Sequence, residues 1–209
     1  MSDLLPLFPL PNVVLFPNVF LPLHIFEPRY REMVADALAS DRMIGMVLLR
    51  PGWDRDYEGR PPIYSVGCSG VLTHTERLPD GRYNLVLRGI ERFQILEEDQ
   101  TLSYRRAVVE PLRDRPLDAA DRITILRQRS KLESMLGTNQ SSAGDPRMPA
   151  SMSDEDLVNA LAQYLDLEAL EKQALLERPC LRTRAEALVE LLEMKILMAR
   201  TPGLPRVAH

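Results

Sequence analysis

The feature that most constrains this chain is a long apolar stretch, Leu4–Tyr30, which proline interrupts every few residues. Its prolines are Pro6, Pro9, Pro11, Pro17, Pro22 and Pro28. Each proline lacks a backbone N–H and restricts the residue before it to an extended conformation. A membrane-spanning helix needs roughly 20 uninterrupted apolar residues, and a signal peptide needs a basic start that Met1–Asp3 lacks. The stretch is therefore predicted to be neither.

We expect short extended segments here instead. Val13–Phe16 is a continuous apolar run, typical of a strand buried on both faces, and Val19–Leu23 is predicted as a second strand or a strand-like crossover. Pro17 and Pro22 then belong at strand ends or edges, where a missing N–H costs little.

Composition limits the class of protein. The 209 residues are enough for one large domain or two small ones, and 45% hydrophobic with 27% charged residues is ordinary for a soluble globular protein. A net charge of −4 gives no overall basic field for nucleic acid or an anionic membrane. Cys68 and Cys180 lie far apart without disulfide or zinc spacing, which predicts reduced thiols in a cytoplasmic protein.

The next part of the chain predicts one helix and a series of strands. Pro28 suits the first position of a helix over 27–40, whose apolar residues recur with helical spacing. A buried strand is expected at 43–49, before an irregular loop at 50–62. Further strands are expected at 65–76, 83–88, 92–97 and 102–110. Leu78–Arg82 has the proline, aspartate and glycine of a tight turn. Short strands separated by glycine-containing turns predict a small barrel or curled sheet.

The remainder is predicted to be helical. A helix from near Leu117 to Leu136 precedes a Ser/Gly/Pro-rich mobile loop at 137–152. Three further helices are expected, with caps at Ser153, Asp166 and Thr183. We therefore divide the chain into a β-barrel part, 1–115, and an α-helical part, 116–209.

Two groups of motifs resemble one known family. The first is Pro-Leu-Phe-Pro-Leu at 6–10, Val-Val-Leu-Phe-Pro at 13–17, Leu-Pro-Leu at 21–23 and Phe-Glu-Pro-Arg-Tyr at 26–30. The second is Val-Gly-x-x-Gly at 66–70 followed by Gly-x-x-Arg-Phe at 89–93. In this order they resemble the N-terminal, substrate-binding domain of Lon proteases, to which the Lon-like domain of cereblon is related. The resemblance is close over roughly the first 110 residues and looser over the helical part.

The resemblance implies an α+β fold. Its first part would be a PUA-like closed or curled β-barrel with one inserted helix, and a C-terminal helical bundle would follow. A complete Lon protease also has an ATPase module and a serine–lysine protease domain. This sequence contains no Gly-x-x-x-x-Gly-Lys-Ser/Thr phosphate-binding loop. We expect a stand-alone version of the substrate-recognition domain.

No residue pattern predicts catalysis. Gly67-Cys68-Ser69-Gly70 lacks the final glycine of a nucleophile elbow, because Val71 stands at that position. A bend in a strand explains these glycines better. The three histidines, His24, His74 and His209, share no metal-ligand spacing. We expect no enzyme activity, no cofactor and no metal.

The first functional hypothesis is a non-enzymatic module that binds unfolded or tagged polypeptide, as the resemblance implies. The driving force would be burial of apolar side chains. The candidate contact residues are Phe16, Phe20, Phe26, Trp53 and Tyr57. For each of them the alternative is packing in the core, and for Trp53 and Tyr57 the alternative is a loop that folds back over it.

Two other hypotheses stay open. The barrel of this family is similar to RNA-modification domains, and the chain has one basic cluster, diluted by acidic neighbours: Arg105, Arg106, Arg113 and Arg115. The third hypothesis is a regulatory partner of a full-length Lon or another ATPase, or a homo-oligomer. The last helix favours it, because Met194, Leu197 and Met198 lie outside its main apolar stripe.

Overall fold

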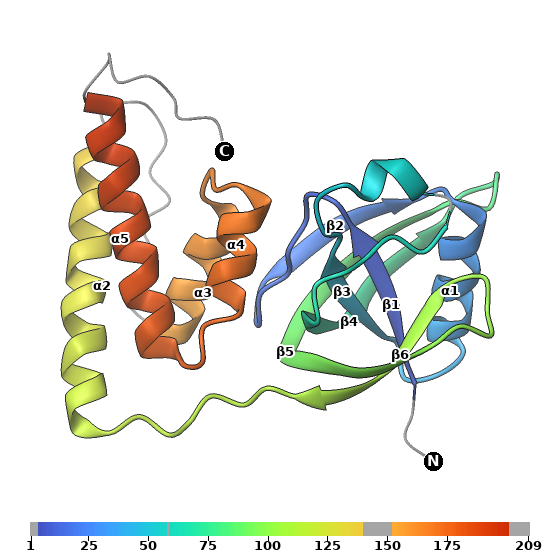
Figure 1. Ribbon diagram of the computed structural model, residues 1–209, viewed down its shortest axis with the longest axis horizontal. Coiled ribbons are helices and arrows are strands. Elements are labelled where there is room, and N and C mark those ends of the chain that lie inside the picture. The colour runs from blue at the N-terminus through green and yellow to red at the C-terminus, as the bar shows by residue number, and fades with distance from the viewer. Residues whose placement is uncertain (1–3, 58, 140–151, 201–209) are drawn as a thin grey trace. The chain divides into compact units, whose positions relative to one another are not determined.

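The computed structural model describes residues 4–57, 59–139 and 152–200, and these form two compact units (Figure 1). The first unit comprises the chain through Asp114 together with Asn159–Glu177. The second comprises Arg115–Val158 and the chain from Arg178 onward. The first division falls beside the predicted boundary after residue 115, whereas Asn159–Glu177 groups with the sheet and not with the other helices. Among the described helices, none is long and apolar enough to cross a membrane.

The first unit is built on a six-stranded sheet in the described part of the chain. Its strands are β1 (Leu5–Leu10), β2 (Phe20–Ile25), β3 (Met43–Leu48), β4 (Val66–Arg77), β5 (Tyr83–Asp99) and β6 (Arg105–Pro111). The order is β2-β5-β4-β3-β1-β6, and β6 also pairs with β5. Each strand from β5 through β4, β3 and β1 to β6 therefore pairs with the next, and β6 pairs with β5 again. Only β1 and β3 are parallel. A mixed α+β fold is confirmed.

The helix predicted at 27–40 is α1 (Pro28–Leu38), and Pro28 occupies its first turn as expected. Its buried face is the predicted apolar stripe, which includes Tyr30 and Met33. The strand predicted at 43–49 is β3. In both elements the apolar spacing of the sequence agrees with the face that the fold buries.

The first apolar stretch differs from its prediction. Val13–Phe16 belongs to no strand, although Val14, Leu15 and Phe16 are buried, whereas β1 contains Pro6 and Pro9 in the interior of the sheet. The pairing explains how β1 accommodates two prolines. β1 pairs with β6 through Leu5, Pro6 and Leu7, and with β3 through Leu7 to Leu10. Each proline has a partner strand on one side only, so its missing N–H can face the open side. Pro22 lies in the edge strand β2, as expected.

The prediction of two strands at 83–88 and 92–97 is wrong, because β5 is continuous through Gly89. A Cβ at Gly89 would lie 2.1 Å from the carbonyl oxygen of Phe16. The backbone of the proline-rich coil continues alongside, since Gly89 N–H donates to Val19 O at 2.9 Å. This glycine marks a close backbone approach and not a break in the strand. The last predicted strand begins later than expected, at Arg105 in β6.

Two helical segments complete the first unit. They are the C-terminal part of α3 (Asp154–Tyr164) and α4 (Ala169–Leu176). Buried amide side chains join them to the sheet region. Asn159 Nδ2 donates to Pro17 O at 3.3 Å, and Gln173 Nε2 donates to Val66 O at 3.0 Å. The helices thus satisfy backbone groups that the irregular coil and the strand end leave unpaired.

The second unit contains α2 (Ala119–Asn139), α5 (Leu181–Arg200) and the start of α3. The helices α2 and α5 lie side by side, and Lys131 Nζ is 3.2 Å from Glu193 Oε1 between them (Figure 1). Because α2 extends to Asn139, the mobile loop predicted at 137–152 begins inside a helix. Its remainder, 140–151, lies outside the described residues.

One of the three predicted caps is correct. Ser153 Oγ accepts from the N–H of Asp156 at 3.1 Å at the start of α3. The cap of α4 is Glu168 and not Asp166, and the Glu171 side chain completes its capping box. Thr183 is not a cap, because α5 begins two residues earlier and the Thr183 hydroxyl donates to Cys180 O. In both cases the predicted start of the helix is wrong by only two or three residues.

Candidate functional site

Two of the predicted contact residues lie at the ends of an edge strand. Phe20 begins β2 and Phe26 follows its last residue, with 49% and 60% of their surfaces exposed. The ring of Phe26 stacks on that of exposed His24, with centroids 6.3 Å apart. The strand pairs only with β5 among the described residues. β2 therefore has an open edge and an exposed phenylalanine at each end.

A third exposed ring borders this strand. Tyr164, at the end of α3, is exposed, and its hydroxyl donates to Phe20 O at 3.0 Å. This contact holds the tyrosine ring next to the first residue of β2. Sequence reasoning missed Tyr164, because 144 positions separate it from Phe20 and only the fold brings the two together.

Phe16 is not available to a ligand. Its side chain is completely buried, and its backbone N–H donates to Gln163 Oε1 at 3.2 Å. Core packing, the alternative for this residue, is what the structure shows. Phe16 is buried and Phe20 is exposed, although both belong to the same proline-rich stretch.

Trp53 and Tyr57 fold back over the core. The predicted irregular loop at 50–62 contains one turn of 3₁₀ helix, η1 (Trp53–Asp56), whose short length hid it from pattern analysis. The rings of Trp53 and Tyr57 meet edge to face with centroids 5.5 Å apart. Both are partly buried against the core cluster around Leu7 and Phe93. Their first role is therefore structural, although Tyr57 also lines a pocket.

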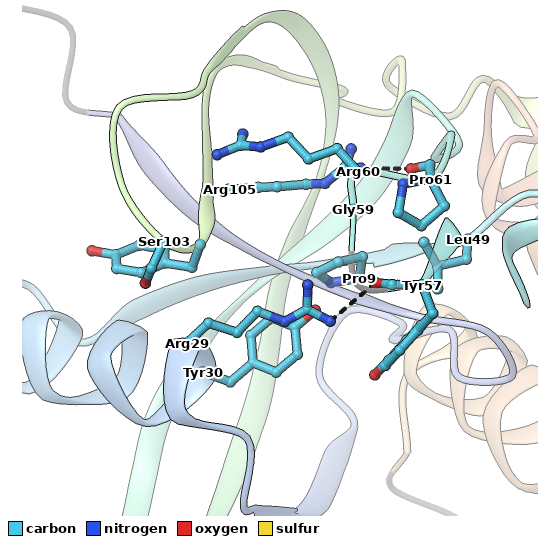
Figure 2. A pocket seen from close by; sticks show the side chains of 11 residues that line it. Pro9, Arg29, Tyr30, Leu49, Tyr57, Gly59, Arg60, Pro61, Ser103 and Arg105 are labelled. Carbon is cyan, nitrogen blue, oxygen red and sulfur yellow. Dashed lines mark hydrogen bonds between the residues drawn. The ribbon is translucent and has the colours of Figure 1, made fainter. Parts of the chain in front are cut away.

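This pocket has a volume of about 250 Å³ and contains arginine and tyrosine side chains (Figure 2). The charged and aromatic residues that line it are Arg29, Arg60, Arg105, Tyr30, Tyr57 and Tyr104. In the view of Figure 2, Arg29 and Tyr30 lie on one side, and Arg60 and Arg105 lie together on the other. The pocket is thus positively charged and lined with aromatic rings.

Glu27 organises the side of the pocket near α1. Its carboxylate accepts a hydrogen bond from Tyr57 OH at 2.5 Å and forms an ion pair with Arg29 at 3.0 Å. Arg29 Nη2 also donates to Tyr57 O at 3.3 Å. Burial and the hydrogen bond to Glu27 raise the pKa of the Tyr57 phenol. The phenol is therefore a protonated donor at neutral pH, and it ties the loop to the start of α1.

The opposite side is formed by Arg105 and Arg60. Arg105 is only 7% exposed, and it donates to Glu98 Oε2 at 3.0 Å and to Pro61 O at 2.6 Å. Burial lowers the pKa of Arg105, and the positive charge of Arg60 lowers it further, while Glu98 opposes the shift. The two guanidinium groups therefore lie close enough to repel each other.

The predicted basic cluster does not form a basic surface. Arg105 faces the pocket and binds Glu98, Arg106 forms an ion pair with Asp99, and Arg115 forms one with Asp121 at 2.7 Å. Three of its four arginines are thus paired with carboxylates. The acidic neighbours that dilute the cluster in sequence also neutralise it in space.

Ser69 and His24 form contacts within the sheet, whereas His209 lies outside the described residues. Gly67–Gly70 lies within β4, where Ser69 Oγ donates to Glu91 O at 3.1 Å. His24 Nδ1 lies 2.7 Å from Asn84 Oδ1 on the neighbouring strand. Within residues 4–57, 59–139 and 152–200, no group of three or more His, Cys, Asp or Glu side chains could hold a metal ion.

The family model of the ATP-dependent protease La (LON) substrate-binding domain matches residues 4–194. Lon protease 2 of Myxococcus xanthus is 27% identical over 207 residues, which cover 92% of this chain and 24% of that protein. Lon protease of Anaeromyxobacter dehalogenans is 28% identical over 199 residues, which cover 91% of this chain and 23% of that protein. The chain thus spans less than a quarter of the length of these curated relatives.

Two solved structures share the fold. A Lon N-terminal domain protein from Xanthomonas campestris is 25% identical, with a TM-score of 0.61 over 90% of this chain and 98% of that one. The N-terminal domain of the Mycobacterium avium complex Lon protease is 17% identical, with a TM-score of 0.67 over 91% of this chain and 98% of that one. The family resemblance is confirmed: the chain belongs to the family of the ATP-dependent protease La (LON) substrate-binding domain.

Proposed function

We propose that this chain is a non-enzymatic module that binds extended segments of unfolded polypeptide along β2. The observation that carries the proposal is the open edge of β2 with an exposed phenylalanine at each end, Phe20 and Phe26. Membership of a family described by substrate binding supports it. We also propose that the strands of the first unit form the PUA-like closed barrel of this family, with β2 attached to its outside through β5.

The physical basis is strand addition combined with apolar burial. An extended segment can form main-chain hydrogen bonds with a free strand edge, while its side chains alternate between the two faces. Covering the exposed half of each phenylalanine is worth about 1–1.5 kcal/mol before ordering costs are subtracted. Pro22 interrupts the donors of β2 near its middle. Binding is therefore weak and divided into short contacts, which suits sequence-tolerant recognition.

The test is fluorescence anisotropy of a labelled, permanently unfolded polypeptide with the purified chain. The double variant Phe20→Ser/Phe26→Ser should weaken binding about tenfold or more, because both apolar contacts are lost. Leu96→Ser is the matched control, since Leu96 is an equally exposed apolar residue of β5, 60% exposed, outside the proposed surface. Thermal unfolding should be unchanged in both. Equal losses in the two variants, or binding of folded controls as tight as of the unfolded chain, would contradict the proposal.

A second candidate is association with a protein partner or with another copy of the chain through α5. Met194, Leu197 and Met198 are exposed on this helix within the second unit. Light scattering separates the possibilities: a dimer that Leu197→Glu converts to a monomer would favour self-association. The RNA hypothesis is less well supported, because most of its basic cluster forms ion pairs. A steep dependence of RNA affinity on salt concentration would revive it.

A further inference from the structure

The arginine pocket of the first unit has one guanidinium group that its surroundings only partly satisfy. Arg60 Nη2 donates to Leu102 O at 3.0 Å and to Gln100 O at 3.3 Å. Its Nη1 is buried and has no hydrogen-bond partner in the described part of the chain. A buried donor without an acceptor is destabilising, and proteins contain few of them. Of the buried side-chain nitrogens without a partner in the described residues, this is the one whose side chain lines the arginine pocket, and an acceptor on a ligand there would satisfy it.

The charges around the pocket do not balance. Of the three arginines that line it, Arg29 is paired with Glu27 and Arg105 with Glu98. Arg60 forms no ion pair among the described residues. The carboxylates of Glu32 and Asp36 are near, but they accept from Ser103 Oγ and Tyr104 OH and do not line the pocket. Among the described residues that line the pocket, one positive charge is therefore in excess, which suits a monoanion better than a phosphate dianion.

The remaining walls indicate what the anion is attached to. Pro9, Leu49 and the ring of Tyr30 supply apolar surface beside the guanidinium groups. The volume of about 250 Å³ is slightly below the usual range for ligand pockets, so the pocket holds a small group and not a folded chain. A planar guanidinium matches a carboxylate in shape and hydrogen-bond geometry.

We propose that this pocket binds a carboxylate carried by a small apolar or aromatic group, through the guanidinium of Arg60 and the positive field of Arg29 and Arg105. Such a carboxylate can come from a free organic acid or from the C-terminal residue of a peptide. The inference goes beyond the proposed binding of polypeptide along β2, because it uses other residues and requires no extended segment.

The chain has a built-in reporter for the test. Trp53 is its single tryptophan, and its ring contacts Tyr57, which lines the pocket. N-acetyl-phenylalanine should change the fluorescence of Trp53 in a saturable way. N-acetyl-phenylalaninamide, which has the same ring and no charge, should bind at least tenfold more weakly. Equal binding of acid and amide, or tighter binding of inorganic phosphate than of the acid, would overturn the proposal.

Two variants assign the binding to Arg60. Arg60→Gln should weaken the binding of N-acetyl-phenylalanine at least tenfold, because the charged donor is lost. Arg55→Gln is the matched control, since Arg55 is an exposed arginine of η1 in the same loop that does not line the pocket. It should change affinity less than twofold. Unchanged affinity in Arg60→Gln would refute the assignment. If that variant unfolds, the wild-type protein still tests the proposal. N-acetyl-phenylalanine should raise the melting temperature of the wild-type protein, and N-acetyl-phenylalaninamide should not.

Two further comparisons identify the source of the carboxylate and separate the two proposals. If 3-phenylpropionate binds as well as N-acetyl-phenylalanine, the ligand of the pocket is a free organic acid. If 3-phenylpropionate binds more weakly, the peptide group contributes to binding and the ligand is the C-terminal residue of a peptide. Either result supports a carboxylate pocket. The Phe20→Ser/Phe26→Ser variant should bind the acid normally, so failure of the β2 proposal and failure of the pocket proposal remain distinguishable.

Discussion

The backbone N–H of Phe16 donates a hydrogen bond to the side chain of Gln163, 147 residues further along the chain, at 3.2 Å. The contact lies within the first unit and joins the proline-rich coil to α3. Phe16 belongs to no strand, so its N–H has no sheet partner. A helix from the far end of the sequence supplies the acceptor, and this contact is one of several that join Asn159–Glu177 to the sheet region.

We therefore expect Gln163→Ala to destabilise the chain by about 1–3 kcal/mol, the cost of leaving a buried N–H without an acceptor. Urea denaturation followed by circular dichroism measures it. Gln100→Ala is the control, because the Gln100 side chain is exposed and forms no hydrogen bond within the described residues. A loss of the same size in both variants would show that the Phe16 contact does not stabilise the fold.

Two glycines should respond oppositely to the same substitution. Gly89→Ala should destabilise by about 2–3 kcal/mol, because its Cβ would overlap the carbonyl oxygen of Phe16. Gly137 lies in α2, and a Cβ there meets nothing within 4 Å. Gly137→Ala should therefore stabilise by about 0.5–1 kcal/mol, since alanine has the higher helix propensity. Urea denaturation of both variants tests the pair, and a stable Gly89→Ala protein would contradict the close approach.

The hydrogen bond from Tyr57 to Glu27 predicts a dependence of stability on pH. The pKa of Tyr57 is raised above its ordinary value of 10.0, first by burial and then by this bond. A raised folded-state pKa means that its stabilisation is complete below pH 10 and is lost as pH rises through the folded-state pKa. The difference in unfolding free energy between wild type and Tyr57→Phe should be constant from pH 7 to 9 and should shrink above pH 10. A difference that grows above pH 10 would show that the sign is wrong.

Much of the local structure could be predicted from the sequence. Pro28 and the apolar spacing after it predicted α1 and its buried face. The turn at Leu78–Arg82 is also as expected: Gly81 has a positive φ of 82°, and Asp80 Oδ1 accepts from the N–H of Arg82 at 3.0 Å. These features depend on a few consecutive residues, so the residue types determine them.

The sequence-based predictions were wrong where contacts between distant segments determine the local structure. Pro6 and Pro9 lie inside the sheet because β3 and β6 pair with different parts of β1. Gly89 continues a strand because another backbone passes beside it. The arginine pocket could not be predicted, because Arg29, Arg60 and Arg105 come from α1, a loop and β6. No local pattern marks residues that only the fold assembles.

The sequence by itself determined the family, the α+β class, most helices and strands, and which apolar residues have the spacing of a buried face. Tertiary structure alone decided which phenylalanines of the proline-rich stretch are exposed and which of the three arginines that line the pocket lacks a carboxylate partner among the described residues. The physical reason is that local backbone conformation depends on neighbouring residues, whereas burial and charge pairing depend on which distant segments come into contact. Phe16 and Phe20 have the same side chain four positions apart, and only packing against α3 and β5 made one core and the other surface.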